Sequence, residues 1–279
     1  MKLVSFTTAD GKIRPGALFE EGGLVADLTT AGFADALAVI AAGWTAYQPG
    51  GVHPAYPLAE VRLHAPLLNP PRVFAIGLNY RDHARELGLT PPAVPVVFFK
   101  LQTAIIGPGE AIVLPVNSRE PDYEAEMAFV IGKGGHRIPA ASWREHVYGY
   151  TILNDVSARD VQFATSQWTL GKSFPTFCPI GPAIVTSDEI DDPHALEIGL
   201  SIDGVVHQHS NTREMIFGIP QLIEYLSSVV PLLPGDIVAT GTPPGVGVGR
   251  TPKRWLKPGE TVTITIEGLG SLSNRVVAE

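Results

Sequence analysis

The chain of 279 residues carries 28 acidic and 20 basic side chains, which gives a formal net charge of −8. This charge argues against a nucleic-acid partner, because binding to phosphates requires a basic face. Hydrophobic residues make up 45% of the chain and charged residues 17%, the composition of a packed globular protein rather than a disordered one.

The single cysteine, Cys178, has no partner for an intrachain disulfide, which fits a reducing compartment. We interpret it as a small buried apolar side chain. The N-terminal residues lack the apolar core of a signal peptide, and no run approaches the ~20 apolar residues of a membrane span. We therefore expect a cytoplasmic protein with no membrane partner.

Residues 1–66 are predicted to form a small N-terminal β-rich domain, and residues 67–279 the main domain. Short apolar runs separated by turn signals indicate strands at 3–6, 17–19 and 24–28. A short helix is expected at 34–42, ended by Gly43. A stretch with several prolines between residues 49 and 71 is interpreted as the linker.

Residues 67–279 are rich in strand-forming sequences and poor in helical ones. Strands are predicted at 73–77, 96–99, 124–131, 149–156, 237–240 and 261–267. The pair Asp203-Gly204 between two apolar alternations predicts a hairpin over 196–206. Helices are predicted at 82–87, 158–165 and 220–229. The pattern favours a strand-dominated mixed α/β fold, arranged as a β-roll or barrel, over alternating βαβ units.

Glu124 and Glu126 lie two positions apart in one predicted strand, so their carboxylates share a face. Two carboxylates in a mostly buried strand repel each other unless a cation or a proton separates them. Asp155 closes a second apolar strand. Three carboxylates without His or Cys nearby form an oxygen-rich site that suits Mg²⁺, Mn²⁺ or Ca²⁺ rather than Zn²⁺. Solvated acids at strand edges are the alternative interpretation.

His83 and Glu86 lie three positions apart in the helix predicted at 82–87, and therefore on one helix face. A carboxylate bound to one imidazole nitrogen fixes the tautomer and leaves the other nitrogen as a general base. Taken alone, the pair is more typical of a surface pair on a short helix.

Two lysines have sequence contexts that do not by themselves indicate a site. Lys172, in a Gly-Lys-Ser-Phe turn, is typical of a solvated lysine. For Lys100, which ends an apolar run, a position outside the site is favoured over one that reaches it. Gly241 and Gly245 are interpreted as serving turn geometry rather than contacting a ligand. The glycine-rich segment 245–249 leads to no helix, which argues against a dinucleotide-binding loop.

Six motifs of residues 70–279 occur in the order found in one known family. They are Gly77-x-Asn79-Tyr80-x-x-His83-x-x-Glu86, Asp122-Tyr-Glu124-x-Glu126, Asn154-Asp155-Val-Ser-Ala-Arg159-Asp160-Val-Gln162, Gly171-Lys172-Ser173-Phe174, Pro234-Gly-Asp236-Ile and Ala239-Thr-Gly-Thr242-Pro-Pro-Gly245-Val-Gly247. Together they resemble the fumarylacetoacetate hydrolase family, and residues 1–66 resemble the small β domain of many members. The resemblance implies a β-roll core and a homodimer.

The resemblance also implies a metal, a catalytic pair and a substrate class. Glu124, Glu126 and Asp155 would hold Mg²⁺ or Mn²⁺, with Ca²⁺ as a substitute in crystals. His83 and Glu86 would form a catalytic dyad on a helix that closes over a small 2-oxo acid. Further matches to substrate-contacting positions are Tyr80, Arg159, Gln162, Lys172 and Thr242, and Lys172 also matches a catalytic position.

The function predicted from this resemblance is metal-dependent C–C hydrolysis of a 2,4-dioxo acid, of the acylpyruvate or fumarylpyruvate type, to pyruvate and a carboxylic acid. His83, oriented by Glu86, would deprotonate the attacking water. Neighbouring reactions are alternatives: decarboxylation of oxaloacetate, and isomerisation or hydration of unsaturated 2-oxo dioic acids in aromatic catabolism. The alternative from another class is a non-enzymatic binding module stabilised by its metal.

Overall fold

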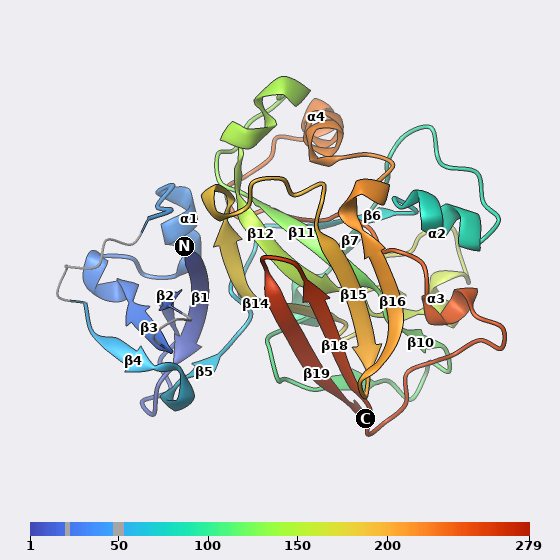
Figure 1. Cartoon of the computed structure of the whole chain (residues 1–279), viewed down its shortest axis with the longest axis horizontal. Coiled ribbons are helices and arrows are strands. Elements are labelled where there is room, and N and C mark those ends of the chain that lie inside the picture. The colour runs from blue at the N-terminus through green and yellow to red at the C-terminus, as the bar shows by residue number, and fades with distance from the viewer. Residues whose placement is uncertain (20–22, 47–52) are drawn as a thin grey trace.

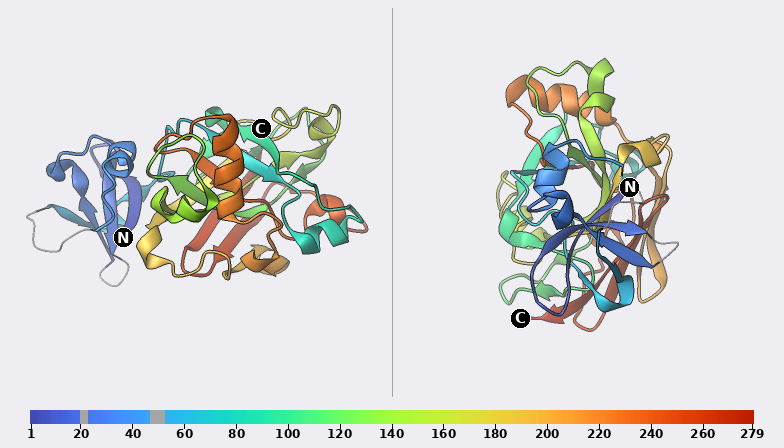
Figure 2. Two further views of the ribbon diagram at one scale, coloured as in Figure 1. Left: turned by 90° about the horizontal axis from the view of Figure 1, so that it is seen from above. Right: turned by 90° about the vertical axis from the view of Figure 1, so that its left-hand side faces the viewer.

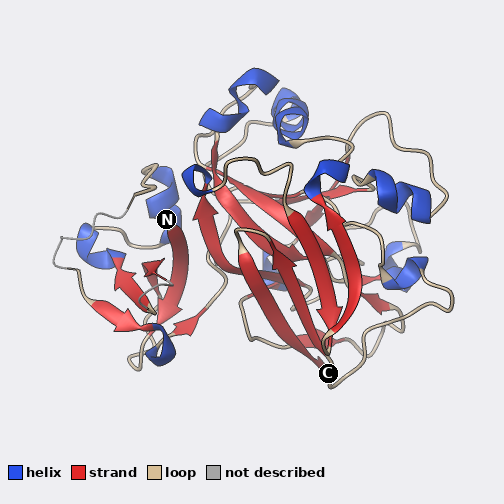
Figure 3. Cartoon of the chain, in the orientation of Figure 1, coloured by secondary structure: helices blue, strands red, loops and turns tan. Residues whose placement is uncertain are grey.

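The computed structural model describes residues 1–19, 23–46 and 53–279. The fold is strand-dominated mixed α/β, as the sequence predicts. Two large sheets face each other, and short helices lie around them (Figure 3). The main hydrophobic core fills the space between the two sheets.

The longer sheet has twelve strands and extends across the molecule. Its strands are β1 (Lys2–Thr7), β2 (Arg14–Phe19), β3 (Leu24–Asp27), β4 (Ala55–Pro57), β5 (Arg62–Leu63), β6 (Val73–Gly77), β7 (Val96–Lys100), β8 (Ile105–Ile106), β11 (Ala125–Ile131), β12 (Val147–Asn154), β14 (Cys178–Thr186) and β17 (Ile237–Ala239). The main path runs β4-β3-β2-β1-β14-β12-β11-β17-β6-β7, while β5 pairs with β1 and β8 with β14.

The shorter sheet has five strands and lies in front of the longer one in Figure 1. Its strands are β9 (Ile112–Leu114), β15 (Glu197–Ile202), β16 (Val205–Asn211), β18 (Thr261–Ile266) and β19 (Gly270–Ala278), in the order β16-β15-β18-β19-β9. β15 and β16 form the predicted hairpin, whose turn holds Asp203 and Gly204, both with positive φ. A separate pair joins β10 (Pro121–Asp122) to β13 (Ser157–Ala158).

The helices are α1 (Ala36–Ala41), α2 (Arg81–Glu86), α3 (Arg159–Gln162) and α4 (Ile219–Val229). Single 3₁₀ turns occur at Leu28–Ala31, Leu58–Glu60, Gln102–Ala104, Ala140–Glu145, Ser187–Glu189, Thr212–Glu214 and Gly247–Gly249. α3 is shorter than the helix predicted at 158–165, because the Thr165 hydroxyl bonds the backbone of Gln167 instead. α2 and α3 lie at the end of the molecule opposite the N-terminal strands (Figures 1 and 2).

The N-terminal strands, blue in Figure 1, continue the longer sheet, because β1 pairs antiparallel with β14 and places Lys2 opposite Val185. Part of the predicted linker forms strands instead, with β4 paired to β3 and β5 to β1. Residues 47–52 of that stretch lie outside the described residues. A small core unites Val4, Phe6, Leu18, Val25 and Ala183. The domain boundary at residue 66 stays a prediction.

Strand β11 places the acidic residues. It lies between β12 and β17 and is buried along its whole length. Met127 and Phe129 pack into the main core between the sheets, whereas Ala128 and Val130 pack into a second core. Because side chains alternate along a strand, Glu126 lies on the second face, away from the shorter sheet.

Candidate metal centre and active-site pocket

The antiparallel pairing of β11 and β12 brings three carboxylates together. Ala125 pairs with Asn154, and just beyond this pair the Asp155 N–H donates to the Glu124 carbonyl over 2.9 Å. Carboxylate oxygens of Glu124, Glu126 and Asp155 lie within 4.8 Å of one another, and all three residues are buried. The structure therefore assembles the acidic group that the sequence predicts.

Two buried lysines contact these acids. Lys172 Nζ donates to Glu124 Oε2 and to Asp155 Oδ2, each over 2.7 Å. Lys100 Nζ bonds Asp155 Oδ1 and also donates to two backbone carbonyls, those of Val156 and Lys172. The sequence favoured a position for Lys100 outside the site, and the structure differs. A signal was present, because Lys100 shares a strand face with the buried Phe98.

A buried arginine completes the ring of cations. Arg159 donates from Nη2 to Glu124 Oε1, from Nη1 to Gln162 Oε1 and from Nε to Asp122 Oδ2. Asp122 also accepts the backbone N–H groups of Gly247 and Val248, over 2.7 and 3.0 Å. Asp122 therefore fixes both the guanidinium and the loop that follows β17.

The charges of this cluster do not balance. It holds the carboxyl groups of Asp122, Glu124, Glu126 and Asp155 against the cations of Lys100, Arg159 and Lys172, and every one of these residues is buried. Three positive charges leave one of the four carboxyl groups without a counter-charge. The contacts show which one it is.

Glu126 is the uncompensated acid. The Gly241 N–H donates to its Oε2 over 2.8 Å, but within the described ranges it forms no salt bridge. Burial, with repulsion from Asp155 and Glu124, raises the pKa of Glu126. Burial also raises the pKa of Glu124, but the Arg159 and Lys172 cations outweigh it and bring that pKa down to about 2.

A divalent cation fits this set of donors. The three clustered carboxylates offer only oxygen, as Mg²⁺, Mn²⁺ and Ca²⁺ prefer. A cation would also supply the counter-charge that Glu126 lacks. The arrangement thus accepts the metal that the sequence predicts.

His83 and Glu86 form the predicted pair on α2. His83 Nδ1 lies 2.9 Å from Glu86 Oε2, so the carboxylate accepts the Nδ1 proton and leaves Nε2 as a base. The second Glu86 oxygen, Oε1, accepts the Gly245 N–H over 2.8 Å. Gly245 has φ +104, and a Cβ there would meet the His207 carbonyl at 2.0 Å, so this turn requires glycine.

A pocket of about 290 Å³ opens between the dyad and the acids. Its polar lining includes His83, Glu124, Glu126, Arg159, Gln162, Lys172 and Thr242. Its apolar lining includes Ile76, Leu87, Leu89, Val96, Phe98, Phe163, Trp168 and Val248. The predicted residues thus gather at one pocket, but three of them do not line it. Glu86 contacts it only through His83. Asp155 lies beneath its lining, and Tyr80 is fully buried behind it, with a hydroxyl that has no hydrogen-bond partner in the described chain.

Gln208 on β16 belongs to the candidate site although no sequence motif selects it. It is 1% exposed, and its Nε2 donates to Thr242 Oγ1 over 2.9 Å and to the Pro243 carbonyl over 2.8 Å. Its Oε1 accepts the Ala125 N–H between the two glutamates, over 2.9 Å. It therefore links the metal-centre strand to a pocket-lining hydroxyl. No sequence pattern marks it, because it lies in a polar run.

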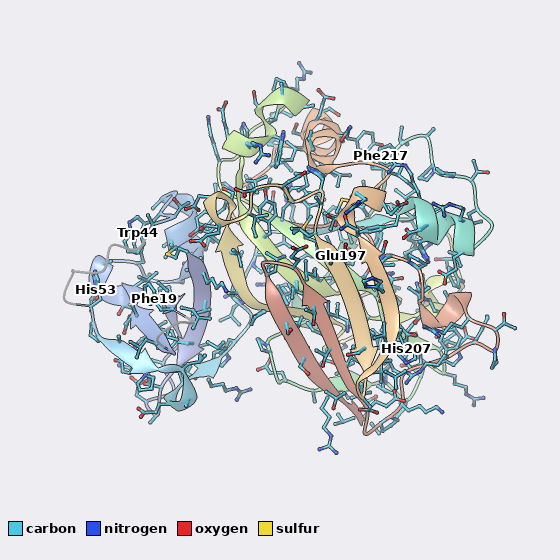
Figure 4. All side chains as sticks on the ribbon, viewed as in Figure 1. Phe19, Trp44, His53, Glu197, His207 and Phe217 are labelled. Carbon is cyan, nitrogen blue, oxygen red and sulfur yellow. The ribbon has the colours of Figure 1, made fainter. Side chains whose placement is uncertain are left out.

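Other candidate groups lie away from the pocket. His207 (labelled in Figure 4) lies on β16, and its Nδ1 is 3.1 Å from the Tyr123 hydroxyl. Cys178 is fully buried and free, as predicted, and burial raises its pKa to about 12. No helix in the described ranges is long and apolar enough to cross a membrane.

Comparison with known proteins gives consistent matches. Residues 72–277 match the family model described as Fumarylacetoacetate (FAA) hydrolase C-terminal. The mitochondrial oxaloacetate tautomerase FAHD2A of Bos taurus is 49% identical over 226 residues, which cover 80% of this chain and 72% of that protein. A fumarylacetoacetate hydrolase structure from psychrophilic Exiguobacterium antarcticum aligns with a TM-score of 0.90 and 36% identity over 100% of both chains. A 5-carboxymethyl-2-hydroxymuconate delta-isomerase structure from Mycobacterium smegmatis gives 0.82 and 38% identity, covering 100% of this chain and 99% of that one.

Proposed function

The chain belongs to the fumarylacetoacetate hydrolase family, and we propose on this basis that it isomerises a small 2-oxo acid by moving a proton between carbon and oxygen or between two carbons. The observation that carries the proposal is His83. Among the described residues that line the pocket, it is the one titratable group that does not belong to the buried cluster of carboxylates and cations. The names of relatives, a tautomerase and an isomerase, favour this reaction over C–C hydrolysis.

The metal-binding residues in this proposal are Glu124, Glu126 and Asp155, with Mg²⁺ or Mn²⁺ as the cation. When bound, the cation supplies Lewis acidity toward the 2-oxo group, which acidifies the neighbouring C–H bond. The protein's own groups then perform the proton transfer.

His83 acts as the base. Its Nε2 takes a proton from C3, the electron pair of that C–H bond becomes the C2–C3 double bond, and the π pair of the C2 carbonyl moves onto its oxygen to give the enolate. Glu86 stabilises the imidazolium through the Nδ1 hydrogen bond of 2.9 Å. Return of the proton to the oxygen gives tautomerisation, and return to a more distant carbon of an unsaturated acid gives isomerisation. No atom is gained or lost.

The pocket walls support proton return rather than proton loss. Leu87, Val96, Phe98 and Trp168 form apolar surface around the space that His83 faces. Apolar walls reduce the contact of the imidazolium with water and so slow the exchange of its proton. Return of that proton to the substrate then competes with exchange into solvent.

C–C hydrolysis of 2,4-dioxo acids is the second candidate. The same dyad can deprotonate a water, and a relative named fumarylacetoacetate hydrolase shares the fold with a TM-score of 0.90. Decarboxylation of oxaloacetate requires neither an activated water nor a proton base at the start, so it belongs in the same test.

A substrate panel decides among these reactions. With Mg²⁺ or Mn²⁺, the protein should accelerate the enol-to-keto change of oxaloacetate, or the rearrangement of 5-carboxymethyl-2-hydroxymuconate, both followed by ultraviolet absorbance. Pyruvate release from acetylpyruvate at a higher kcat/KM would favour the hydrolase. Inactivity on all substrates, with intact metal binding, would favour a non-enzymatic binding module.

A further inference from the structure

Every oxygen of Glu124 and Asp155 already bonds a cationic side chain. Glu124 bonds Arg159 and Lys172, and Asp155 bonds Lys100 and Lys172. A metal that binds these carboxylates must therefore share them with an existing cation or replace one. The hydrogen bonds show which of the three cations can leave the triad without breaking other contacts.

Two of the three cations are held by groups outside the acidic triad. Arg159 is fixed by Asp122 and Gln162 as well as by Glu124. Lys100 donates to the carbonyls of Val156 and Lys172, and it does not line the pocket. Removing either cation from the triad would break hydrogen bonds that have nothing to do with a metal.

Lys172 differs from both. Its ammonium has two hydrogen-bond acceptors, Glu124 Oε2 and Asp155 Oδ2, and both belong to the proposed metal ligands. Its side chain lines the pocket, and its Nζ lies 5.1 Å from the centre of the Phe98 ring, a contact that favours a cation. Its backbone carbonyl is held by Lys100, so the side chain can move while the backbone stays fixed.

We propose that the Lys172 ammonium and the metal compete for Glu124 and Asp155: metal binding displaces Lys172 from the bridge between these carboxylates, and its side chain turns into the pocket. The released ammonium then binds the anionic 2-oxo acid. This inference rests on the proposed metal centre and assigns the order of events, because the metal must bind before Lys172 is free to bind substrate. Lys100 and Arg159 are the fixed counter-charges that remain.

The test compares Lys172→Met with Lys100→Met, each of which removes one buried positive charge next to Asp155. Mn²⁺ binding is measured by calorimetry without substrate, and binding of oxalate is then measured at saturating Mn²⁺. Lys172→Met should bind Mn²⁺ about tenfold or more tightly than wild type, since a competing charge is gone, and should bind oxalate more weakly. Lys100→Met should gain less Mn²⁺ affinity than Lys172→Met.

Two results would overturn the exchange. One is unchanged Mn²⁺ affinity in Lys172→Met, and the other is an equal gain in both variants, which indicates a general charge effect. If Lys172→Met does not fold, wild-type crystal structures with and without Mn²⁺ decide the matter. The Nζ should leave at least one of its two carboxylates when Mn²⁺ is bound, and a bridge kept in full contradicts the proposal. None of these measurements needs turnover, so a failed substrate panel defeats the proposed function and leaves this test standing.

Discussion

Gln208 Nε2 donates a hydrogen bond to Thr242 Oγ1 across 2.9 Å. The threonine oxygen accepts this bond, so its own proton is free to point into the pocket that Thr242 lines. Gln208 thereby makes Thr242 a donor toward an anionic substrate. It is a positioning residue, since it does not line the pocket itself.

Replacing Gln208 with Met should affect both stability and substrate binding. The buried Ala125 N–H loses its acceptor, which should lower the free energy of unfolding by about 1–3 kcal/mol. KM should rise more than kcat falls, because Thr242 loses its fixed orientation. Urea unfolding and steady-state kinetics would measure the two effects. Thr242→Val is the control: it should raise KM while the Ala125 N–H keeps its acceptor, so its loss of stability comes only from the Gln208–Thr242 bond. An unchanged KM would remove Thr242 from the substrate site.

Substitution of His83 separates base chemistry from metal binding. His83→Ala should lower turnover by ~10²–10⁴-fold, the usual loss for a missing general base. Mn²⁺ and oxalate affinities should stay near wild type, because His83 forms no bond to the acidic triad. Glu86→Gln should cost less, since the imidazole remains. Loss of Mn²⁺ binding in His83→Ala would make His83 a ligand and contradict this division of roles.

Substitution of Glu126 should have opposite effects on the metal-free and metal-bound protein. Glu126→Gln removes the carboxyl that lacks a counter-charge but keeps an oxygen for the Gly241 N–H, so the metal-free Tm should rise. Mn²⁺ should raise the Tm of the wild type by linkage, and this increase should shrink or vanish in the variant. Thermal melts in EDTA and in excess Mn²⁺ test both statements. A full Mn²⁺-induced increase in the variant would exclude Glu126 as a ligand.

Gly77 controls the shape of the pocket through Trp168. A Cβ at Gly77 would lie 2.3 Å from Trp168 Cζ3, so Gly77→Ala must displace the indole that lines the pocket. We expect kcat/KM to fall more for 5-carboxymethyl-2-hydroxymuconate than for the smaller oxaloacetate. Gly77→Ala combined with Trp168→Leu should recover activity on the larger substrate. Equal losses on both substrates, unrelieved in the double variant, would contradict control by this contact.

The homodimer stays a prediction, and the exposed edge of the longer sheet gives a physical reason to expect it. β7 is the last strand on the main path of the longer sheet, and Val96, Phe99 and Leu101 at this edge are exposed. Exposed apolar side chains on an edge strand favour association. Light scattering should give about twice the monomer mass of 29.7 kDa, and a mass near 29.7 kDa would refute the dimer.

Local sequence patterns predicted single strands and a hairpin turn of the fold correctly. The strand at 73–77 has the predicted limits, and the Asp203-Gly204 turn closes the predicted hairpin. Strand β14 was not predicted, because Pro179, Gly181 and Pro182 interrupt its apolar residues. The strand forms because β14 pairs with β1 and β12, which are distant from it in the chain.

The candidate site likewise contains residues that a local pattern indicates and residues that only long-range contacts bring in. The spacing of Glu124 and Glu126 indicated a shared face but left solvated acids as an alternative, and the spacing of His83 and Glu86 alone favoured a surface pair. The family resemblance assigned these four residues to the site. The contact of Lys100 with Asp155 spans 55 positions, and no local pattern encodes it. The site residues that sequence reasoning missed, Lys100 and Gln208, gain their roles from partners distant in the chain.

The bond between Glu86 and Gly245 spans 159 positions. Glu86 orients His83 through Oε2. Its Oε1 is held by the N–H of Gly245, a residue that is synthesised late. The dyad is therefore fixed only after the segment around Gly245 has folded back onto α2. A chain that ends before β17 also lacks the strand that pairs with β11. Fragments of this kind should therefore have neither the ordered acidic strand nor the fixed base.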